Sequence, residues 1–283
     1  MPDARGRADV LNLAIPRAGL RDGDGAGIRV AVLDTGIESA HPALQGVVLA
    51  DDVILEGDGP RVRVRDGAGE DAYGHGTAIA GIIHALAPRA VLGSFRVLGA
   101  DLASRSAIIA AGVRLAMDRG YHVLNCSFGC RGEATYVLSF KEWVDEAYLR
   151  QVHVVSACSN VDIDRREWPA HFPTVVAVNM ARTVPGVFHH LPDHLVEFAT
   201  GGQEVPVAWS GGGTKTVTGS SYAAPVMSAL LARLLSRTGP MHPVIAKSVL
   251  RALAEPWSEG IAARNVRRAV VTSAVRVPPA GAP

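Results

Sequence analysis

The stretch "VTGSSYAAPVMSALLARLL" (residues 217–235) places two adjacent serines between a glycine and a long apolar segment. Serine is a poor residue for a helix interior but a good N-cap, so one interpretation is simply that a helix begins here. The other interpretation is a nucleophile, because the N–H groups at a helix N-terminus favour developing negative charge. Only the rest of the chain can decide between the two.

The composition is that of a globular chain of 283 residues, with 48% hydrophobic residues, 19% charged residues and a formal net charge of +1. This near-neutral charge gives no reason to expect nucleic acid or an anionic membrane as a partner. No apolar run reaches the roughly 18 residues that span a bilayer, and the beginning of the chain lacks the apolar core of a secretory signal. The three cysteines form neither an even set nor a CxxC pair. We therefore expect free thiols and a cytoplasmic protein.

Short β-branched segments alternate with helical patterns along most of the chain. Strands are expected at residues 28–33, 90–98, 122–129, 152–160 and 174–181, and helices at residues 76–88, 104–120 and 137–150. Buried strands joined by helical crossovers predict an α/β fold, with three layers and a mostly parallel sheet flanked by helices on both faces. Residues 28–275 are expected to form one domain. Residues 1–27 would be an extension packed on it or leading into it, and residues 276–283 a disordered tail.

Polar residues stand where several of these strands end, at the edge where parallel sheets bind ligands. Asp34 and Asn160 each follow a strand, and His75 and Ser221 stand where helices begin. A serine hydroxyl needs a base to become a nucleophile, histidine suits that task, and a buried carboxylate fixes the tautomer of the histidine. The chain order Asp, His, Ser differs from the orders of nucleophile-elbow hydrolases and of chymotrypsin.

Three motifs carry a resemblance to the subtilisin-like serine proteases, the subtilase family. "VAVLDTGIESAHPAL" (residues 30–44) resembles the aspartate motif of the family, "DAYGHGTAIAG" (residues 71–81) its histidine motif and "GSSYAAP" (residues 219–225) its serine motif. The resemblance implies a subtilisin-like fold and a serine endopeptidase in which Ser221 is the nucleophile, His75 the general base and acid, and Asp34 the residue that orients His75.

Two further segments extend the resemblance to substrate binding. "VLNCSFG" (residues 123–129) looks like the strand that pairs with the substrate backbone, which implies an extended polypeptide substrate against Ser127, Phe128 and Gly129. "VVSACSN" (residues 154–160) looks like the strand that leads to the oxyanion-hole asparagine, here Asn160. Ala157, Cys158 and Ser159 would then border the S1 pocket. Ser159 stands where the family generally has glycine, so we expect a narrower pocket.

No cofactor is expected, and no compact Asp/Asn-rich loop indicates a structural calcium site. The histidines of residues 184–198 favour a solvated loop over a metal site. Few residues precede Asp34, so the chain resembles compact intracellular subtilases without signal or prodomain, including those that mature precursor peptides. A catalytically silent peptide-binding module, or a peptide ligase or esterase with the same triad, stays open as an alternative, and so does the oligomeric state.

Overall fold

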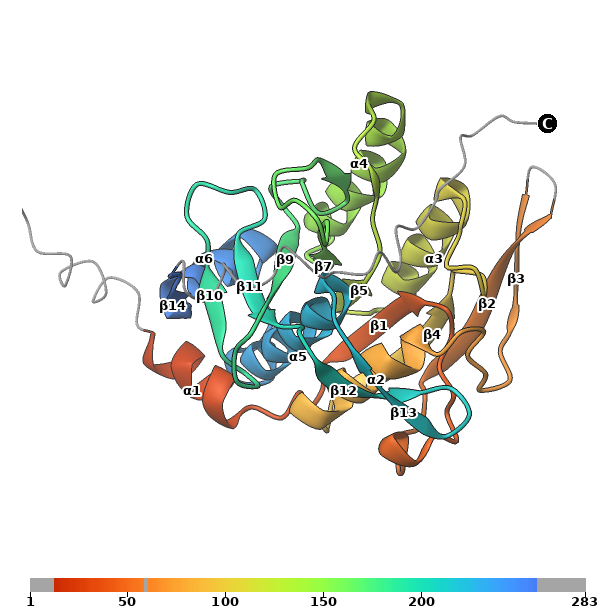
Figure 1. Cartoon of the computed structure of the whole chain (residues 1–283), viewed down its shortest axis with the longest axis horizontal. Coiled ribbons are helices and arrows are strands. Elements are labelled where there is room, and N and C mark those ends of the chain that lie inside the picture. The colour runs from red at the N-terminus through yellow and green to blue at the C-terminus, as the bar shows by residue number, and fades with distance from the viewer. Residues whose placement is uncertain (1–12, 59–60, 259–283) are drawn as a thin grey trace, which may run out of the picture.

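A ten-stranded sheet with the order β14-β10-β11-β9-β7-β5-β1-β4-β2-β3 forms the centre of the protein (Figure 1). The structure is a computed structural model and describes residues 13–58 and 61–258. Six neighbouring strands in the middle are parallel, and they are β1 (Arg29–Asp34), β4 (Val91–Arg96), β5 (Val123–Cys126), β7 (His153–Ala157), β9 (Val176–Ala181) and β11 (Phe198–Gly201). Their apolar side chains are buried on both faces, as continuous apolar runs predict.

Two additions extend this parallel centre at its edges. On one side β2 (Asp51–Asp58) pairs with β4 in parallel, and β3 (Arg61–Asp66) pairs with β2 in the antiparallel direction. On the other side β10 (Phe188–His190) is antiparallel to β11, and β14 (Glu255–Pro256) lies beside β10. Strand β3 has the sequence "RVRVRD", and its three arginines are exposed along the outer edge of the sheet.

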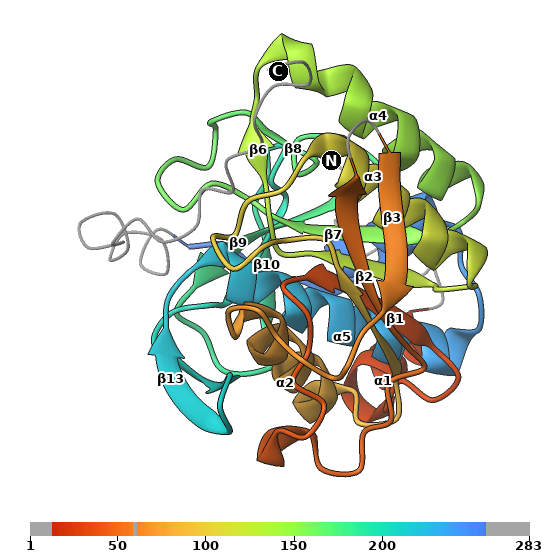
Figure 2. The same ribbon diagram turned by 90° about the vertical axis from the view of Figure 1, so that its right-hand side faces the viewer.

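Helices cover both faces of the sheet (Figure 2). One face carries α1 (Ala14–Asp22), α2 (His75–Leu86), α5 (Ser220–Thr238) and α6 (Pro243–Leu253). The other face carries α3 (Ser106–Asp118) and α4 (Ala134–Leu149). The prediction of a three-layer, mostly parallel α/β fold is therefore confirmed.

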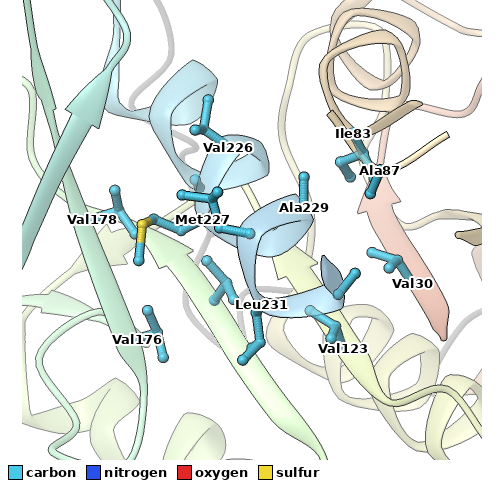
Figure 3. Close-up of a cluster of buried hydrophobic side chains, with 14 of the residues drawn as sticks. Val30, Ile83, Ala87, Val123, Val176, Val178, Val226, Met227, Ala229 and Leu231 are labelled. Atoms are coloured by element: carbon cyan, nitrogen blue, oxygen red, sulfur yellow. The ribbon is translucent and has the colours of Figure 1, made fainter. Parts of the chain in front are cut away.

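Helix α5 is buried on almost all sides, because its sequence is apolar around the whole helix. Figure 3 shows Met227 beside Val178, and Leu231 between Val176 and Val123 of the sheet. A helix packed in this way has little freedom to slide or rotate. Its first turn, which carries the two serines, is therefore held in place by the core.

Several expected elements differ from those in the structure. Strand β10 lies within residues 184–198, which were expected to form a solvated loop, and for β10 this expectation was wrong. His189 is buried, and its Nδ1 lies 3.1 Å from the carbonyl oxygen of Pro256. The sheet continues there because β11 and β14 flank the segment on either side. The hairpins β2–β3 and β12–β13 (Val205–Trp209 and Gly213–Val217) were not anticipated.

The beginning of the described chain packs on the domain through α1. Gly19 of α1 lies so close to α5 that a Cβ atom on it would be 3.3 Å from Leu234 Cα. The tail expected at residues 276–283 lies outside the described residues. Within the described part of the chain, no helix is long and apolar enough to cross a membrane.

Truncation of Leu231 to alanine tests how far the site depends on this core. Leu231 is fully buried. We expect Leu231→Ala to lower the free energy of unfolding by about 2–5 kcal/mol, because it removes apolar contacts and leaves a cavity. Leu138 of α4 is 75% exposed, so Leu138→Ala is the control and should change stability little. Denaturant unfolding of both variants measures the difference, and equal stabilities would contradict the packing of α5.

Candidate active site

Asp34 and His75 contact each other at the carboxyl edge of the sheet, and Ser221 stands next to Tyr222, whose ring packs against His75. Asp34 ends β1, His75 is the first residue of α2 and Ser221 is the second residue of α5. The Nδ1 atom of His75 lies 2.8 Å from Asp34 Oδ1 and 3.0 Å from Oδ2. Both side chains are almost completely buried. The ring of His75 packs edge-on against Tyr222, with 5.3 Å between the ring centroids.

The other ring nitrogen of His75, Nε2, is buried and has no hydrogen-bond partner among the described residues. It therefore forms no hydrogen bond with Ser221 in this structure. Catalytic hydrogen bonds are often long in a free enzyme and tighten when substrate binds. The imidazole is therefore held at Nδ1 by Asp34, and its Nε2 remains able to bind a further group.

Asp71 fixes the beginning of α2 and was not singled out from the sequence. Its carboxylate accepts five hydrogen bonds, from the N–H groups of Tyr73, Gly74 and Thr77 and from the hydroxyls of Thr35 and Thr77. These bonds satisfy N–H groups that a helix N-terminus leaves without partners. The sequence "DAYGHGT" (residues 71–77) contains the signal for this role, since an acidic residue shortly before a helix can accept hydrogen bonds from its first N–H groups.

Thr35 and Gly76 bring α2 close to the end of β1. Thr35 donates its N–H to Asp34 Oδ1 (2.8 Å), and its hydroxyl accepts the N–H of Gly76 (3.0 Å). A Cβ atom on Gly76 would lie 2.0 Å from the carbonyl oxygen of Gly36. The residue after His75 must therefore be glycine for the helix to approach the strand this closely.

The surroundings of His75 raise its pKa above the ordinary value. Burial lowers the pKa, because it disfavours the charged imidazolium. The charge and hydrogen bond of Asp34, helped by the charge of Asp71, outweigh this effect and favour the protonated ring. The imidazolium that forms when His75 takes up a proton is thus stabilised by two carboxylates.

A buried chain of hydrogen bonds supports the first turn of α5 from below. The Ser228 hydroxyl donates to Asn125 Oδ1 (2.8 Å), Asn125 Nδ2 donates to Ser127 Oγ (2.9 Å), and Ser127 Oγ donates to the carbonyl oxygen of Ser221 (2.8 Å). The Ser127 side chain thus contacts α5, and its main chain is what remains for a substrate. Ser228 could not be predicted from the sequence, because a serine in the interior of a helix belongs to no recognisable motif.

Asn160 and Ser220 lie together at the N-terminus of α5. Asn160 Oδ1 accepts the N–H of Ser220 at 2.7 Å. A backbone N–H can only donate, so this contact identifies the oxygen of the amide and leaves Nδ2 as a donor at the same helix end. The hydroxyl of Ser220 donates to the carbonyl oxygen of Cys158 at 2.6 Å and is buried. Ser220 is thereby tied to the end of β7, whereas Ser221 is not.

The other residues expected to border the substrate have side chains in different surroundings. The side chains of Phe128 and Ala157 are part of the core. Cys158 packs in a small apolar cluster with Ala170, Ala177 and Val196. Ser159 is buried, and its hydroxyl accepts the N–H groups of the next loop.

Gly129 is only partly buried, and the carboxylate of Glu167 lies against it. Glu167 belongs to β8 (Glu167–Trp168), which pairs with β6 (Cys130–Arg131). No sequence motif singles out this glutamate, since its place beside Gly129 depends on the pairing of two very short strands. Among residues 13–58 and 61–258, no group of three or more His, Cys, Asp or Glu side chains is arranged to hold a metal ion.

Comparison with known families identifies the fold and motifs. Residues 25–275 match the model of the Peptidase_S8 family, described as the subtilase family. This match covers most of the chain, and the chain belongs to the subtilase family. The resemblance drawn from the three motifs is confirmed.

Several characterised proteases are similar to this chain. Subtilisin BL of Lederbergia lenta is 35% identical over 178 residues, which are 60% of this chain and 61% of that protein. The major intracellular serine protease of Bacillus subtilis (strain 168) is 30% identical over 236 residues, 75% of this chain and 69% of that protein. Thermitase of Thermoactinomyces vulgaris is 28% identical over 265 residues, 90% of this chain and 83% of that protein. The matched region thus spans less than two thirds of Subtilisin BL.

Solved structures agree on the fold. The structure of the S41 psychrophilic protease matches with a TM-score of 0.69 and 26% identity, and covers 81% of this chain and 83% of its own. A cold-adapted subtilisin-like serine proteinase matches with a TM-score of 0.65 and 24% identity, over 82% of this chain and 83% of its own. The expected subtilisin-like architecture is therefore confirmed.

The raised pKa of His75 predicts the acid limb of any reaction in which this ring acts as a base. Only the neutral ring accepts a proton, so activity is lost as the pH falls through the pKa of His75. We expect that limb above the ordinary imidazole value of about 6.5. Asp34→Asn removes the main cause that raises the pKa, so the limb should move to lower pH. A titration of the His75 ring by NMR in both variants tests this without relying on activity; an unchanged pKa would contradict it.

Proposed function

We propose that the protein is a serine endopeptidase that hydrolyses peptide bonds through an acyl-enzyme on Ser221. The observation that carries the proposal is the His75 ring, which is held by the buried Asp34 at Nδ1 and is buried but unpartnered within the described structure at Nε2. The contact of this ring with Tyr222 puts His75 beside the first turn of α5, which carries Ser221. A base, its orienting carboxylate and a hydroxyl at a helix N-terminus are the requirements of acyl transfer.

The reaction would proceed in two halves. Ser221 Oγ attacks the carbonyl carbon while His75 Nε2 takes its proton, and the imidazolium is stabilised by Asp34. The oxyanion accepts hydrogen bonds from Asn160 Nδ2 and from the N–H of Ser221, and the helix dipole adds to this stabilisation. His75 then gives the proton to the leaving amine. Water, activated by the same ring, releases the acid in the second half.

The substrate we propose is a polypeptide bound in an extended conformation. Main-chain pairing with residues 127–129 suits this, because the side chains of Ser127 and Phe128 point into the protein and leave the backbone for pairing. A specific precursor peptide is one such substrate. A reducing, cytoplasmic setting is supported by the three free, buried cysteines and by the likeness to an intracellular protease.

Substitution of the paired serines tests the nucleophile. Ser221→Ala should abolish hydrolysis of a peptide mixture and labelling by a fluorophosphonate probe, because it removes the hydroxyl that forms the acyl-enzyme in the proposed reaction. Ser220→Ala is the matched control: it loses the hydrogen bond to Cys158, so it should keep labelling and lose some stability. Mass spectrometry of the labelled protein locates the adduct.

Three outcomes separate the alternatives. Folded parent protein that binds peptides but takes no label would favour a silent peptide-binding module. Label together with transfer to added amines, and little hydrolysis, would favour a ligase. If Ser220→Ala were as damaging as Ser221→Ala, the assignment of the nucleophile would be wrong.

The role of Asn160 is tested by its effect on turnover. Asn160→Ala removes a donor that is needed mainly after the oxyanion has formed, so we expect kcat to fall on the order of 100- to 1000-fold with little change in KM. The variant also loses the bond to the N–H of Ser220, and thermal unfolding should therefore be measured alongside the kinetics. A loss that appears wholly in KM would make Asn160 a ground-state binding residue.

A further inference from the structure

The carboxylate of Glu167 lies at the place where the proposed peptidase would receive the P1 side chain of its substrate. A Cβ atom on Gly129 would be 3.1 Å from Glu167 Oε2 and 3.7 Å from Glu167 Cβ. Gly129 ends the segment expected to pair with the substrate backbone. A glycine there leaves the carboxylate uncovered from the side on which the substrate would lie.

Cys158 and Ser159, which are also expected to border the S1 pocket, interact electrostatically with Glu167. The Ser159 side chain lowers the pKa of Glu167 by favouring its charged form, and the charge of Glu167 helps to raise the pKa of the Cys158 thiol. Gly129, Cys158 and Ser159 come from two separate segments of the chain, after β5 and after β7. Glu167 thus lies against Gly129 and acts electrostatically on Cys158 and Ser159, and it is half-buried rather than fully exposed.

Glu167 has no cationic partner within the protein. No Lys, Arg or His nitrogen among the described residues forms an ion pair with it, although the charge of Arg165 acts on it from the neighbouring loop. Arg131 lies opposite it in the pairing of β6 with β8, and Arg131 also forms no ion pair with it in the described structure. Burial raises the pKa of Glu167 to about 7, which shows how poorly the charge is compensated. A partly buried carboxylate of this kind is stabilised by a cation that arrives from outside.

We propose that Glu167 determines the specificity of the S1 pocket and selects an arginine or lysine at P1. The inference rests on the proposed peptidase function for its geometry. A guanidinium or ammonium group would form a charge-assisted hydrogen bond with the Glu167 carboxylate, and the aliphatic stem would pass Gly129. An apolar P1 side chain would bury the same carboxylate without a partner, which costs free energy. Ser159, where the family generally has glycine, narrows the pocket and favours a slender stem over a broad ring.

The test compares peptides that differ only at P1, with arginine, lysine, leucine or phenylalanine there. We expect the parent protein to cleave the arginine and lysine peptides with the highest kcat/KM. Glu167→Gln keeps the shape of the side chain and removes its charge, so the arginine-to-phenylalanine ratio should fall on the order of 10- to 100-fold, the size of one charge-assisted hydrogen bond. Glu133→Gln is the matched control: Glu133 is exposed at the start of α4, and its loss should leave the ratio unchanged.

Binding separates this inference from the proposed function. The same peptides are titrated into Ser221→Ala by fluorescence anisotropy, with and without Glu167→Gln. If the parent takes no fluorophosphonate label and cleaves nothing, the peptidase proposal fails, while tighter binding of the arginine peptide that is lost in Glu167→Gln would still support the role of Glu167. If the parent cleaves or binds phenylalanine and arginine peptides equally well, the proposal is overturned. It is also overturned if the preference for arginine survives Glu167→Gln.

Discussion

The hydrogen bonds of Asp71 join the end of β1 to the beginning of α2, and the geometry of Asp34 and His75 depends on that junction. Its carboxylate contacts Thr35 on one side and the first N–H groups of the helix on the other. An α-helix turns by about 100° per residue, so a helix that began one residue later would point the His75 ring away from Asp34. A single half-buried carboxylate thus sets the position of a helix relative to a strand, and the contact between Asp34 and His75 follows from it.

Helix α5 is held by an equivalent arrangement at the other side of the site. Two separate side chains tie its first turn to strand ends: Ser127 contacts the carbonyl oxygen of Ser221, and Ser220 contacts the carbonyl oxygen of Cys158. The rest of the helix is fixed by core packing against β5, β7 and β9. Polar contacts therefore set the orientation of the serine, and apolar contacts supply the rigidity that keeps it there.

The central part of the fold was predictable because its signals are local. The strands β1, β4, β5, β7 and β9 are continuous apolar runs, and helical patterns stand between several of them, so these strands and the helices α2, α3 and α4 could be recognised from the sequence. Their ends then placed Asp34, His75 and Ser221 at one edge. The strands β10, β11 and β14 were missed because they are only two to four residues long, and β14 in addition pairs with a segment distant in the sequence.

The finer part of the site was beyond prediction for a related reason. Whether the side chain of Ser127 faces the substrate or the helix is decided by Asn125 and Ser228, which come together only in the folded protein. Glu167 reaches Gly129 only because β8 pairs with β6. Contacts made by tertiary packing leave no periodic pattern in a sequence, so the motifs indicate candidate residues such as Asp34 and His75 better than the residues that surround them.

The outer edge of β3 has a consequence for how copies of the protein behave beside one another. An edge strand offers a row of backbone N–H and C=O groups to which the edge of a second sheet can bind. Here Arg61, Arg63 and Arg65 stand along that edge, and two such edges brought together would place like charges side by side. Charged side chains of one sign on an edge strand disfavour its pairing with a second copy of the same edge, which is one way in which natural sheets avoid growing into fibres.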